Sequence, residues 1–330
     1  MRHVRLGRTG LHVSRLCLGT MTFGLQCDEP SSVAILDRAA ANGISFLDTS
    51  DVYPLGGGLD TVGRSEEILG RWLDGRRQRF IVATKCFGAM SAAPWDRGNS
   101  RKHILDAIEG SLRRLRTDYV DLYQLHHPDA ETPIDESLRA LDDVVRAGKA
   151  RYVGCSNFPA YQVARALGRS EVLGLARFDS VQPRYNLLFR QIERELLPLC
   201  GEEGIGVIPY NPLAGGFLSG KHRAETGPTA GTRFTLGTAG PRYQDRYWHA
   251  REFATVEALR PLAAEAGMSP VQMAVAWVLA HPAITAPIVG ASRPEQLDDA
   301  VAAVDKSLDE SLKRRLDELT REYRTGDDPR

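Results

Sequence analysis

Short apolar runs and amphipathic segments alternate along the whole chain. Between the apolar runs lie segments such as SSVAILDRAAANG and RKHILDAIEGSLRRL, which space apolar residues as a helix does, with Ser or Asn as candidate N-caps and Gly as a stop signal. Eight runs have the length and β-branched composition of buried strands: RLCLGT (15–20), ISFLDT (44–49), RFIVATK (79–85), YVDLYQLH (119–126), ARYVGCS (150–156), FDSVQ (178–182), GVIPY (206–210) and ITAPIVG (284–290). The alternation predicts eight strand–helix units.

Eight such units predict a closed barrel. Parallel strands need a crossover of helical length, and eight of them suffice to close a sheet on itself and remove its edges. The predicted fold class is therefore α/β, a (β/α)8 TIM barrel, with residues 1–330 forming one domain. An open doubly wound sheet is the alternative, but LGTMTFG after the first run does not fit the GxGxxG fingerprint expected there.

Two segments fall outside the repeat. VRLGRTGLHV near the start predicts an N-terminal β-hairpin, two short strands about a turn containing Gly7 and Gly10, which could plug the bottom of the barrel. From Leu213 to Trp248 no helix or strand pattern persists. This stretch predicts a long loop at the C-terminal face, and loops of that length are usually functional.

Composition and charge narrow the class of protein. A chain with 42% hydrophobic and 25% charged residues is typical of a globular protein with a large core. Lys and Arg (42) balance Asp and Glu (42), so neither nucleic acid nor a membrane is expected as a partner. The start, MRHVRLGRTG, lacks the apolar core of a signal peptide, so a cytoplasmic location is expected. The five cysteines are scattered without a CxxC pair and are predicted to be reduced and buried.

Polar residues end most of the predicted strands. In a barrel the chemistry sits where the strands' C-terminal ends open. Asp48 ends one run with Tyr53 just beyond it, Lys85 ends the next, and His126 and His127 follow the third. Later runs end in Ser156 and Asn157, in Gln182 and in Tyr210. Each residue alone has an ordinary structural explanation, but together they predict an active site.

These side chains predict a specific chemistry. A phenol is a poor acid at neutral pH unless a cation stabilises its anion, and Lys85, held by Asp48, could supply that cation to Tyr53. Tyr53 is then a candidate proton donor, and His126 could polarise a carbonyl by hydrogen bonding to its oxygen. No side chain is a source of electrons, so a cofactor must deliver hydride. The amides after the later strands could hold a carboxamide, and Tyr210 could stack on a flat ring.

The motifs FLDTSDVY, VATK, DLYQLHHPD, VGCSNF, VQPRYN, YNPLAGGFLSGK and IVGASRPEQL occur in this order. In them the chain resembles the aldo-keto reductases, from the LGRTGLHVSRLCLGT opening to the last barrel helix. The resemblance implies an NADP-dependent oxidoreductase that uses NADPH to reduce a small-molecule carbonyl, an aldehyde or ketone, to an alcohol. It implies a catalytic tetrad of Asp48, Tyr53, Lys85 and His126.

The resemblance also implies a cofactor site. Ser156, Asn157 and Gln182 would hold the nicotinamide amide. The Leu213 to Lys221 loop would contact the phosphates, and Ser292 and Arg293 a 2′-phosphate, which favours NADPH. The full expected set is Gly19, Thr20, Asp48, Ser156, Asn157, Gln182, Tyr210, Asn211, Leu213, Gly215, Gly216, Lys221, Gly290, Ser292, Arg293, Gln296 and Asp299. Where family members often carry Asn after the acidic position, this chain has Ala300, which weakens the expected adenine contact.

Three residues are expected to wall the substrate pocket: Phe23, Trp95 and His127. A metal site at His126, His127 and Asp129 is an alternative. Adjacent residues on a strand point to opposite faces, so both histidines cannot easily bind one ion, and no metal is predicted.

Three alternatives concern function. In LGRTGLHVSRLCLGTMTFG and YNPLAGGFLSGKH the chain resembles bacterial reductases that include enzymes acting on nucleotide-linked keto-sugars, which implies such a substrate. A nicotinamide-binding sensor or regulatory subunit with little turnover is the competing class, because potassium-channel β subunits share the fold and motifs. Reduction of a carbon–carbon double bond is disfavoured, because relatives with that activity can carry Glu where this chain has His126. The sequence leaves the substrate and the oligomeric state unknown.

Overall fold

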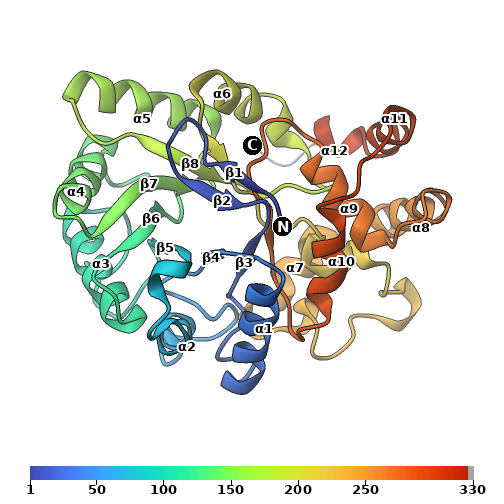
Figure 1. Cartoon of the computed structure of the whole chain (residues 1–330), viewed down its shortest axis with the longest axis horizontal. Coiled ribbons are helices and arrows are strands. Elements are labelled where there is room, and N and C mark those ends of the chain that lie inside the picture. The colour runs from blue at the N-terminus through green and yellow to red at the C-terminus, as the bar shows by residue number, and fades with distance from the viewer. Residues whose placement is uncertain (326–330) are drawn as a thin grey trace.

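Eight parallel strands form one sheet in the computed structural model, which describes residues 1–325 (Figure 1). Seven of the eight lie within the predicted runs, and β5 ends at Cys86, one residue beyond its run, so the predicted alternation is confirmed. In sequence order the strands are β3 (Cys17–Gly19), β4 (Phe46–Asp48), β5 (Ile81–Cys86), β6 (Val120–Leu125), β7 (Ala150–Ser156), β8 (Phe178–Gln182), β9 (Gly206–Val207) and β10 (Ile288–Val289). They are ordered β10-β3-β4-β5-β6-β7-β8-β9 across the sheet.

The sheet closes on itself. Parallel bridges join Val207 to Ile284 and Tyr210 to Ile288, which connects the segment of β9 to that of β10. Closure leaves no free sheet edge, and the predicted (β/α)8 barrel is confirmed.

Helices surround the strands (Figure 1). Asp28, Ser100 and Ser269 accept hydrogen bonds from free backbone N–H groups at the first turns of their helices, as N-caps do. The helices are α1 (Glu29–Ala41), α2 (Arg64–Leu73), α3 (Arg101–Leu115), α4 (Ile134–Arg146), α5 (Ala160–Leu173), α6 (Leu196–Glu203), α7 (Gly240–Tyr247), α8 (Ala250–Glu265), α9 (Pro270–Leu279), α10 (Gln296–Ala303), α11 (Glu310–Leu319) and α12 (Glu322–Thr325).

Two layers of side chains fill the barrel. The lower layer is apolar and includes Phe46, Ala83 and Leu122, all fully buried. Residues two positions apart on a strand share a face, so the next layer along β4, β5 and β6 follows from the sequence spacing. It contains Asp48, Lys85 and Gln124. The barrel is therefore apolar at its bottom and polar at the C-terminal ends of its strands.

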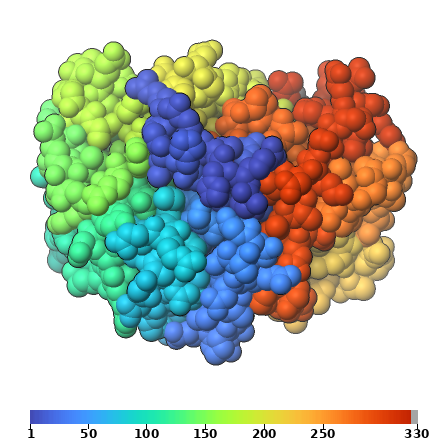
Figure 2. Space-filling model, in the orientation of Figure 1, coloured from blue at the N-terminus to red at the C-terminus, as the bar shows by residue number. Residues whose placement is uncertain are grey.

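The predicted N-terminal hairpin is confirmed and covers the bottom of the barrel. Strands β1 (His3–Arg5) and β2 (His12–Ser14) pair antiparallel, and Leu6 between them is fully buried in the lower layer. Figure 2 shows the hairpin, in dark blue, at the middle of this face. A Cβ on Gly7 would lie 2.4 Å from the carbonyl oxygen of Gly204, so only glycine allows this close contact.

The prediction of an unstructured stretch from Leu213 to Trp248 is wrong in part. This segment contains the 3-10 helices η3 (Ala214–Ser219), η4 (Ala224–Thr226), η5 (Arg233–Thr235) and η6 (Gly237–Ala239), followed by α7. Helix α7 buries Tyr243 and Tyr247, whose hydroxyls hydrogen-bond Asn211 and Asn186. Tertiary contacts thus stabilise a helix in a stretch whose Gly and Pro content gives it a low helix propensity.

All five cysteines are buried and free, as predicted. Within residues 1–325, no single helix has both the length and the apolar composition to cross a membrane; α8 and α9 meet that criterion only as a pair, and they are bent 89° apart.

Candidate active site

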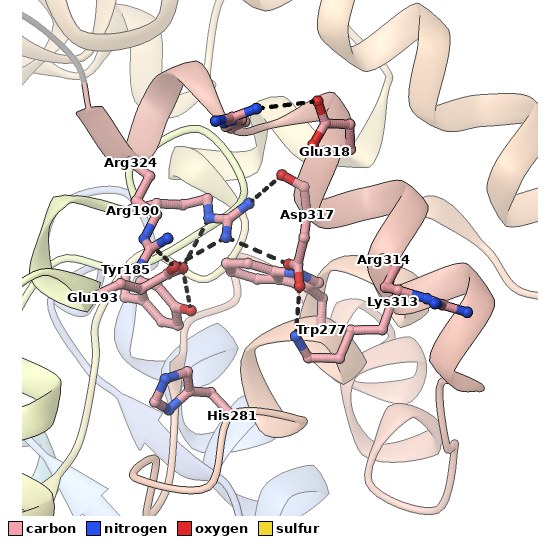
Figure 3. A pocket seen from close by; sticks show the side chains of 11 residues that line it. Tyr185, Arg190, Glu193, Trp277, His281, Lys313, Arg314, Asp317, Glu318 and Arg324 are labelled. Atoms are coloured by element: carbon pink, nitrogen blue, oxygen red, sulfur yellow. Dashed lines mark hydrogen bonds and ion pairs between the residues drawn. The ribbon is translucent and has the colours of Figure 1, made fainter.

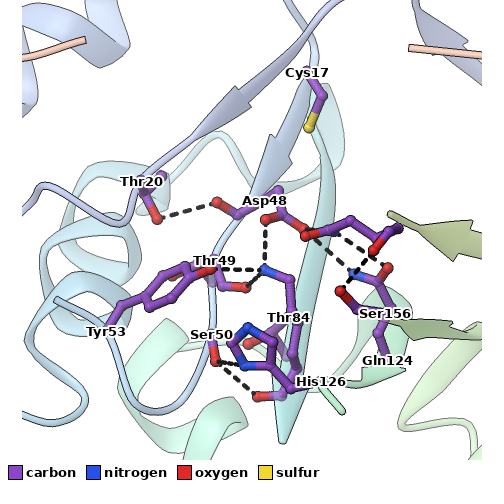
Figure 4. A network of polar contacts seen from close by, with 12 residues as sticks. Cys17, Thr20, Asp48, Thr49, Ser50, Tyr53, Thr84, Gln124, His126 and Ser156 are labelled. Carbon is purple, nitrogen blue, oxygen red and sulfur yellow. Dashed lines mark hydrogen bonds and ion pairs between the residues drawn. The ribbon is translucent and has the colours of Figure 1, made fainter. Parts of the chain in front are cut away.

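A buried ion pair lies at the C-terminal ends of β4 and β5. Lys85 Nζ lies 2.6 Å from Asp48 Oδ1, and both side chains are almost completely buried (Figure 4). Lys85 also donates to the carbonyl oxygen of Thr49 at 2.7 Å. Burial by itself lowers the pKa of Lys85, but the charges of Asp48 and Tyr53 and the hydrogen bonds to both together outweigh burial, and the pKa is raised. Lys85 is therefore a permanent cation inside the barrel.

Tyr53 completes this group. Lys85 Nζ lies 3.4 Å from the Tyr53 hydroxyl oxygen and 4.9 Å from the centre of its ring. Burial raises the pKa of Tyr53 above its ordinary value, and the opposing effect of Lys85 does not cancel it. The expectation that Lys85 makes Tyr53 a stronger acid than an ordinary phenol is not met in this structure. Tyr53 instead keeps its proton at neutral pH, which a proton donor requires.

His126 lies across from Tyr53. The two ring centres are 5.8 Å apart with the rings nearly perpendicular, and His126 Nδ1 lies 3.1 Å from Ser50 Oγ. Burial and the nearby Lys85 cation lower the pKa of His126 well below its ordinary value. The ring is therefore neutral at neutral pH and carries one proton, on either nitrogen.

The two adjacent histidines do not point to opposite faces, contrary to the expectation. Their rings stack with centres 5.2 Å apart, because both residues lie beyond the end of β6 where strand alternation no longer holds. Within residues 1–325, no group of three or more His, Cys, Asp and Glu side chains is placed to hold a metal ion.

The amide-bearing residues after β7 and β8 form one connected cluster. Both amide protons of Asn157 are used, toward the carbonyl oxygen of His126 (3.0 Å) and Ser156 Oγ (3.1 Å). Its Oδ1 accepts a hydrogen bond from the Tyr210 hydroxyl at 2.8 Å. Gln182 Nε2 donates to Asp48 Oδ2 at 2.8 Å, which ties the cluster to the ion pair. The residues expected at the nicotinamide amide are thus brought together.

Gln124, Thr49 and Ser50 belong to this site and were not anticipated from the sequence. Gln124 on β6 faces Lys85 in the strand register and lies 3.3 Å from Asp48 Oδ2. A Gln at the buried position of YVDLYQLH, two residues beyond the inward-facing Leu122, was a usable signal. Thr49 acts through its carbonyl, and no side-chain pattern reveals such a role.

The loop from Leu213 to Lys221, which is expected to contact phosphates, contains two adjacent glycines with positive φ. Gly215 and Gly216 have φ of 70° and 97°, values that favour glycine, and Lys221 Nζ lies beside Gly216. The side-chain nitrogen of Asn211, Nδ2, and one guanidinium nitrogen of Arg233 are buried without a hydrogen-bond partner among the described residues. Buried donors without partners fit an anionic ligand at this place.

A second cation approaches the loop from the segment after β10. Desolvation and the charge of Arg293 both lower the pKa of Lys221, so the two cations lie close enough to repel one another. Neither side chain has an acidic partner within residues 1–325. This arrangement fits the phosphates of a dinucleotide.

The remaining residues expected to bind the cofactor lie in two places, near the ion pair and around the start of α10. Thr20, beside Gly19, donates to the Asp48 carbonyl oxygen at 3.2 Å, so both lie at the mouth near the ion pair. After Gly290, the Ser292 backbone N–H donates to Gln296 Oε1 at 2.8 Å. The carboxylate of Asp299 accepts a hydrogen bond from Gln272 at 2.9 Å and therefore fastens α10 to α9 in this structure.

The three residues expected to wall the substrate pocket differ in their exposure and contacts. Phe23 is fully buried within the main hydrophobic core, so the structure does not support it as a wall. Trp95 is 60% exposed on the loop after β5. His127 stacks on His126, and Phe87, which was not anticipated, lies 5.5 Å from it.

A separate cavity of about 660 Å³ lies between α9, α11 and the η2 turn (Gln191–Glu193) (Figure 3). Its charged side chains bind one another: Arg190 contacts Glu193 at 2.8 Å, and Lys313 contacts Asp317 at 2.6 Å. None of the expected catalytic or cofactor residues lines it. We regard the ion pairs that line this cavity as contacts that hold α11 against the barrel.

Comparison with known proteins agrees with this geometry. The model of the aldo/keto reductase family matches residues 15–321. The chain is 40% identical to the uncharacterized oxidoreductase YrpG of Bacillus subtilis, over 97% of this chain and 96% of that protein. It is 37% identical to a probable voltage-gated potassium channel subunit beta of Arabidopsis thaliana, over 92% of each. It is 35% identical to the versiconal hemiacetal acetate reductase of Aspergillus parasiticus, over 93% of this chain and 94% of that one. The chain therefore belongs to the aldo/keto reductase family, whose members are oxidoreductases that generally use nicotinamide cofactors.

Proposed function

We propose that this protein is an NADPH-dependent reductase that converts an aldehyde or ketone to an alcohol, with Tyr53 as the proton donor. The observation that carries the proposal is the convergence of Tyr53, the buried Lys85–Asp48 pair and His126 from three successive strand ends. Reductase relatives, including one whose name specifies a hemiacetal acetate, support small carbonyl compounds as the substrate class.

Each member of the group has one part in the reaction. A nicotinamide cofactor held by Ser156, Asn157 and Gln182 would supply the hydride for the carbonyl carbon. His126 donates a hydrogen bond from Nε2 to the carbonyl oxygen and polarises the C=O bond. Tyr53 gives its proton to that oxygen as negative charge develops there, and the Lys85 cation, 3.4 Å away, stabilises the phenolate that remains. Asp48 keeps Lys85 charged and in place.

The proposed cofactor preference rests on Arg293, which with Ser292 is expected to bind the 2′-phosphate. A guanidinium binds phosphate oxygens in a forked geometry, so Arg293 would recognise the 2′-phosphate that distinguishes NADPH from NADH. Arg293→Ala should raise the Kd for NADPH by about tenfold to a hundredfold and leave that for NADH nearly unchanged, as measured by fluorescence titration. Arg314→Ala, in the cavity of Figure 3, is the matched control. Equal losses for both cofactors would contradict the assignment.

The reaction itself is tested with NADPH carrying deuterium at the transferable position. The purified protein is incubated with a panel of simple aldehydes, quinones, steroids and nucleotide-linked keto-sugars, and products are analysed by mass spectrometry. From the aldehydes, steroids and keto-sugars we expect an alcohol with one deuterium on the former carbonyl carbon; the hydroquinone formed from a quinone keeps no label and is detected by its mass alone. An unlabelled alcohol, or a label elsewhere, would refute direct hydride transfer. The panel also tests the keto-sugar hypothesis. Activity on simple aldehydes together with no activity on keto-sugars would exclude keto-sugars as the substrate.

A sensor or regulatory subunit is the second candidate, favoured by the identity to a probable potassium channel β subunit. The two candidates differ in the fate of bound NADPH. A sensor retains the cofactor tightly and oxidises it at an effectively zero rate in the presence of every carbonyl in the panel. A reductase releases NADP and turns over.

A further inference from the structure

Ser50 connects the site to a buried carboxyl group. Its hydroxyl oxygen lies 3.1 Å from Asp51 Oδ1 and 3.1 Å from His126 Nδ1. Figure 4 shows the contact between Ser50 and the His126 ring. Ser50 and Asp51 are both completely buried. The second oxygen of Asp51, Oδ2, has no hydrogen-bond partner among the described residues. The hydroxyl of Ser50 is therefore the bridge between Asp51 and the imidazole.

The Ser50 hydroxyl has a single proton to donate to its neighbours. The Ser50 hydroxyl can donate once, and within reach are Asp51 Oδ1, His126 Nδ1 and, at 3.4 Å, the carbonyl oxygen of Lys85. An ionised carboxylate only accepts hydrogen bonds, whereas a protonated carboxyl also donates one. The charge of Asp51 therefore decides which way the Ser50 hydroxyl points.

The direction of that hydroxyl determines the tautomer of His126. When Asp51 is protonated it donates to Ser50, and Ser50 donates to Nδ1, so the imidazole proton resides on Nε2. When Asp51 is ionised it takes the hydrogen bond from Ser50, and Ser50 accepts one from a protonated Nδ1. In the second state Nε2 has no proton and cannot polarise a carbonyl.

We propose that Asp51 is a positioning residue whose protonated carboxyl, acting through Ser50, holds His126 in the tautomer that can donate a hydrogen bond from Nε2. The value of this arrangement for catalysis rests on the function proposed above. The coupling between the three side chains does not.

The charges around Asp51 favour its protonated form. From α2, Glu66 faces it with a carboxylate that binds Arg114 of α3 at 2.7 Å and accepts a hydrogen bond from Thr84 at 2.5 Å. From β5 and β6, Cys86 and Tyr123 bring no cation, and the charge of Asp51 helps to raise the pKa of both.

Burial, together with the charge of Glu66, raises the pKa of Asp51 to about 8, while Ser50 and Arg114 oppose the shift. On the site side the Lys85 ammonium is bound to Asp48, and His126 is neutral because its own pKa is lowered. Asp51 is thus protonated at neutral pH and loses its proton as the pH rises through about 8.

The coupling can be observed without turnover. In the protein labelled with ¹⁵N-histidine, the chemical shifts of Nδ1 and Nε2 report which nitrogen carries the proton, and His126→Asn identifies the signals. We expect the proton of His126 to move from Nε2 to Nδ1 as the pH rises through about 8. A tautomer that stays constant from pH 6 to pH 9.5, while the protein remains folded, would overturn the proposal.

Three variants test the path. Asp51→Asn has no group that ionises, and Ser50→Ala has no bridge, so in each the tautomer should stop depending on pH. Ser50→Thr keeps the hydroxyl and should restore the transition. Asp135→Asn, at an exposed carboxylate that binds Arg169, is the matched control and should keep it. A change of the His126 tautomer at the wild-type pH in Asp51→Asn or in Ser50→Ala would contradict the assignment. If Asp51→Asn does not fold, Ser50→Ala alone provides the test.

Activity provides the second readout. In the wild-type protein kcat for carbonyl reduction should fall about tenfold per pH unit above the transition, and this fall should be absent in Asp51→Asn. A wild-type protein that reduces no carbonyl, yet shows the tautomer shift, refutes the proposed function and leaves this inference standing. An unchanged alkaline fall in Asp51→Asn, with normal reduction by the wild type, refutes the inference alone.

Discussion

Lys85 shows how a charged residue is retained in the centre of the barrel. Removing an ammonium and a carboxylate from water is costly, and the attraction between them offsets that cost only with good geometry and further hydrogen bonds. Here the 2.6 Å contact with Asp48 is supplemented by the Thr49 carbonyl and by Gln182. The pair thus provides a fixed cation next to Tyr53 that does not depend on pH in the neutral range.

Asp51 makes the stability of the protein depend on pH. Its folded pKa, about 8, lies above the value of about 3.9 expected in the unfolded chain, so the folded state binds more protons between these values. The stabilisation is complete below about pH 4 and is lost as the pH rises through about 8. The free energy of unfolding of Asp51→Asn minus that of the wild type should therefore increase with pH over this range, by up to about 1.4 kcal/mol per pH unit.

Urea unfolding at several pH values measures this difference, because groups that are unchanged in the variant cancel. A difference that is constant between pH 5 and pH 8 would show that Asp51 is ionised in the folded protein.

At the scale of residues, the sequence predicts the strand-end side chains well and their surroundings poorly. Asp48, Lys85 and His126 end apolar runs, so their position is visible in the pattern. The raised pKa of Tyr53 and the state of Asp51 depend on how much water the packed helices exclude, and no spacing of residues encodes that.

Helix α7 is the element that covers the loop expected to bind phosphates. A Cβ on Gly215 would lie 2.6 Å from the ring of Tyr243 on α7, and its φ of 70° disfavours any side chain. Gly215→Ala should displace this helix from the loop and raise the Kd for NADPH at least about tenfold, which corresponds to about 1.4 kcal/mol.

The matched control is Gly201→Ala on α6, where an added Cβ meets no atom within 4 Å. Both variants are titrated with NADPH by fluorescence. Equal affinities would show that the segment from Leu213 to Trp248 does not shape the cofactor site.

At the scale of elements, every strand was predictable and α7 was not. The strands are short apolar runs bounded by turn residues, a strong local signal. Helix α7 begins with Gly240 and Pro241 and depends on hydrogen bonds that Tyr243 donates to, and Tyr247 accepts from, residues more than 30 positions away. Such long-range contacts lie outside any local pattern.

The whole molecule separates stability from chemistry between the two faces of the barrel. The hairpin and the apolar layer occupy the bottom, and the polar layer occupies the opposite end. Gly7→Ala should cost at least about 2 kcal/mol of unfolding free energy, because the added Cβ would meet the backbone of Gly204 and Gly206 at a φ of 54°. The rate per folded molecule should not change.

Gly10→Ala in the same turn is the control, because its Cβ would meet nothing within 4 Å. Urea unfolding and a reductase assay on both proteins decide the matter. Equal stabilities would mean that the hairpin does not hold the bottom of the barrel, and a slower rate in Gly7→Ala would mean that the two faces are not independent.

The central claim is that Tyr53 donates the proton in carbonyl reduction. Single-turnover stopped-flow oxidation of bound NADPH by an aldehyde, in the wild type and in Tyr53→Phe, tests it most directly when cofactor binding is measured in the same samples. We expect Tyr53→Phe to bind NADPH like the wild type and to oxidise it roughly 10²- to 10⁴-fold more slowly. A Tyr53→Phe protein that oxidises bound NADPH at the wild-type rate would contradict the account.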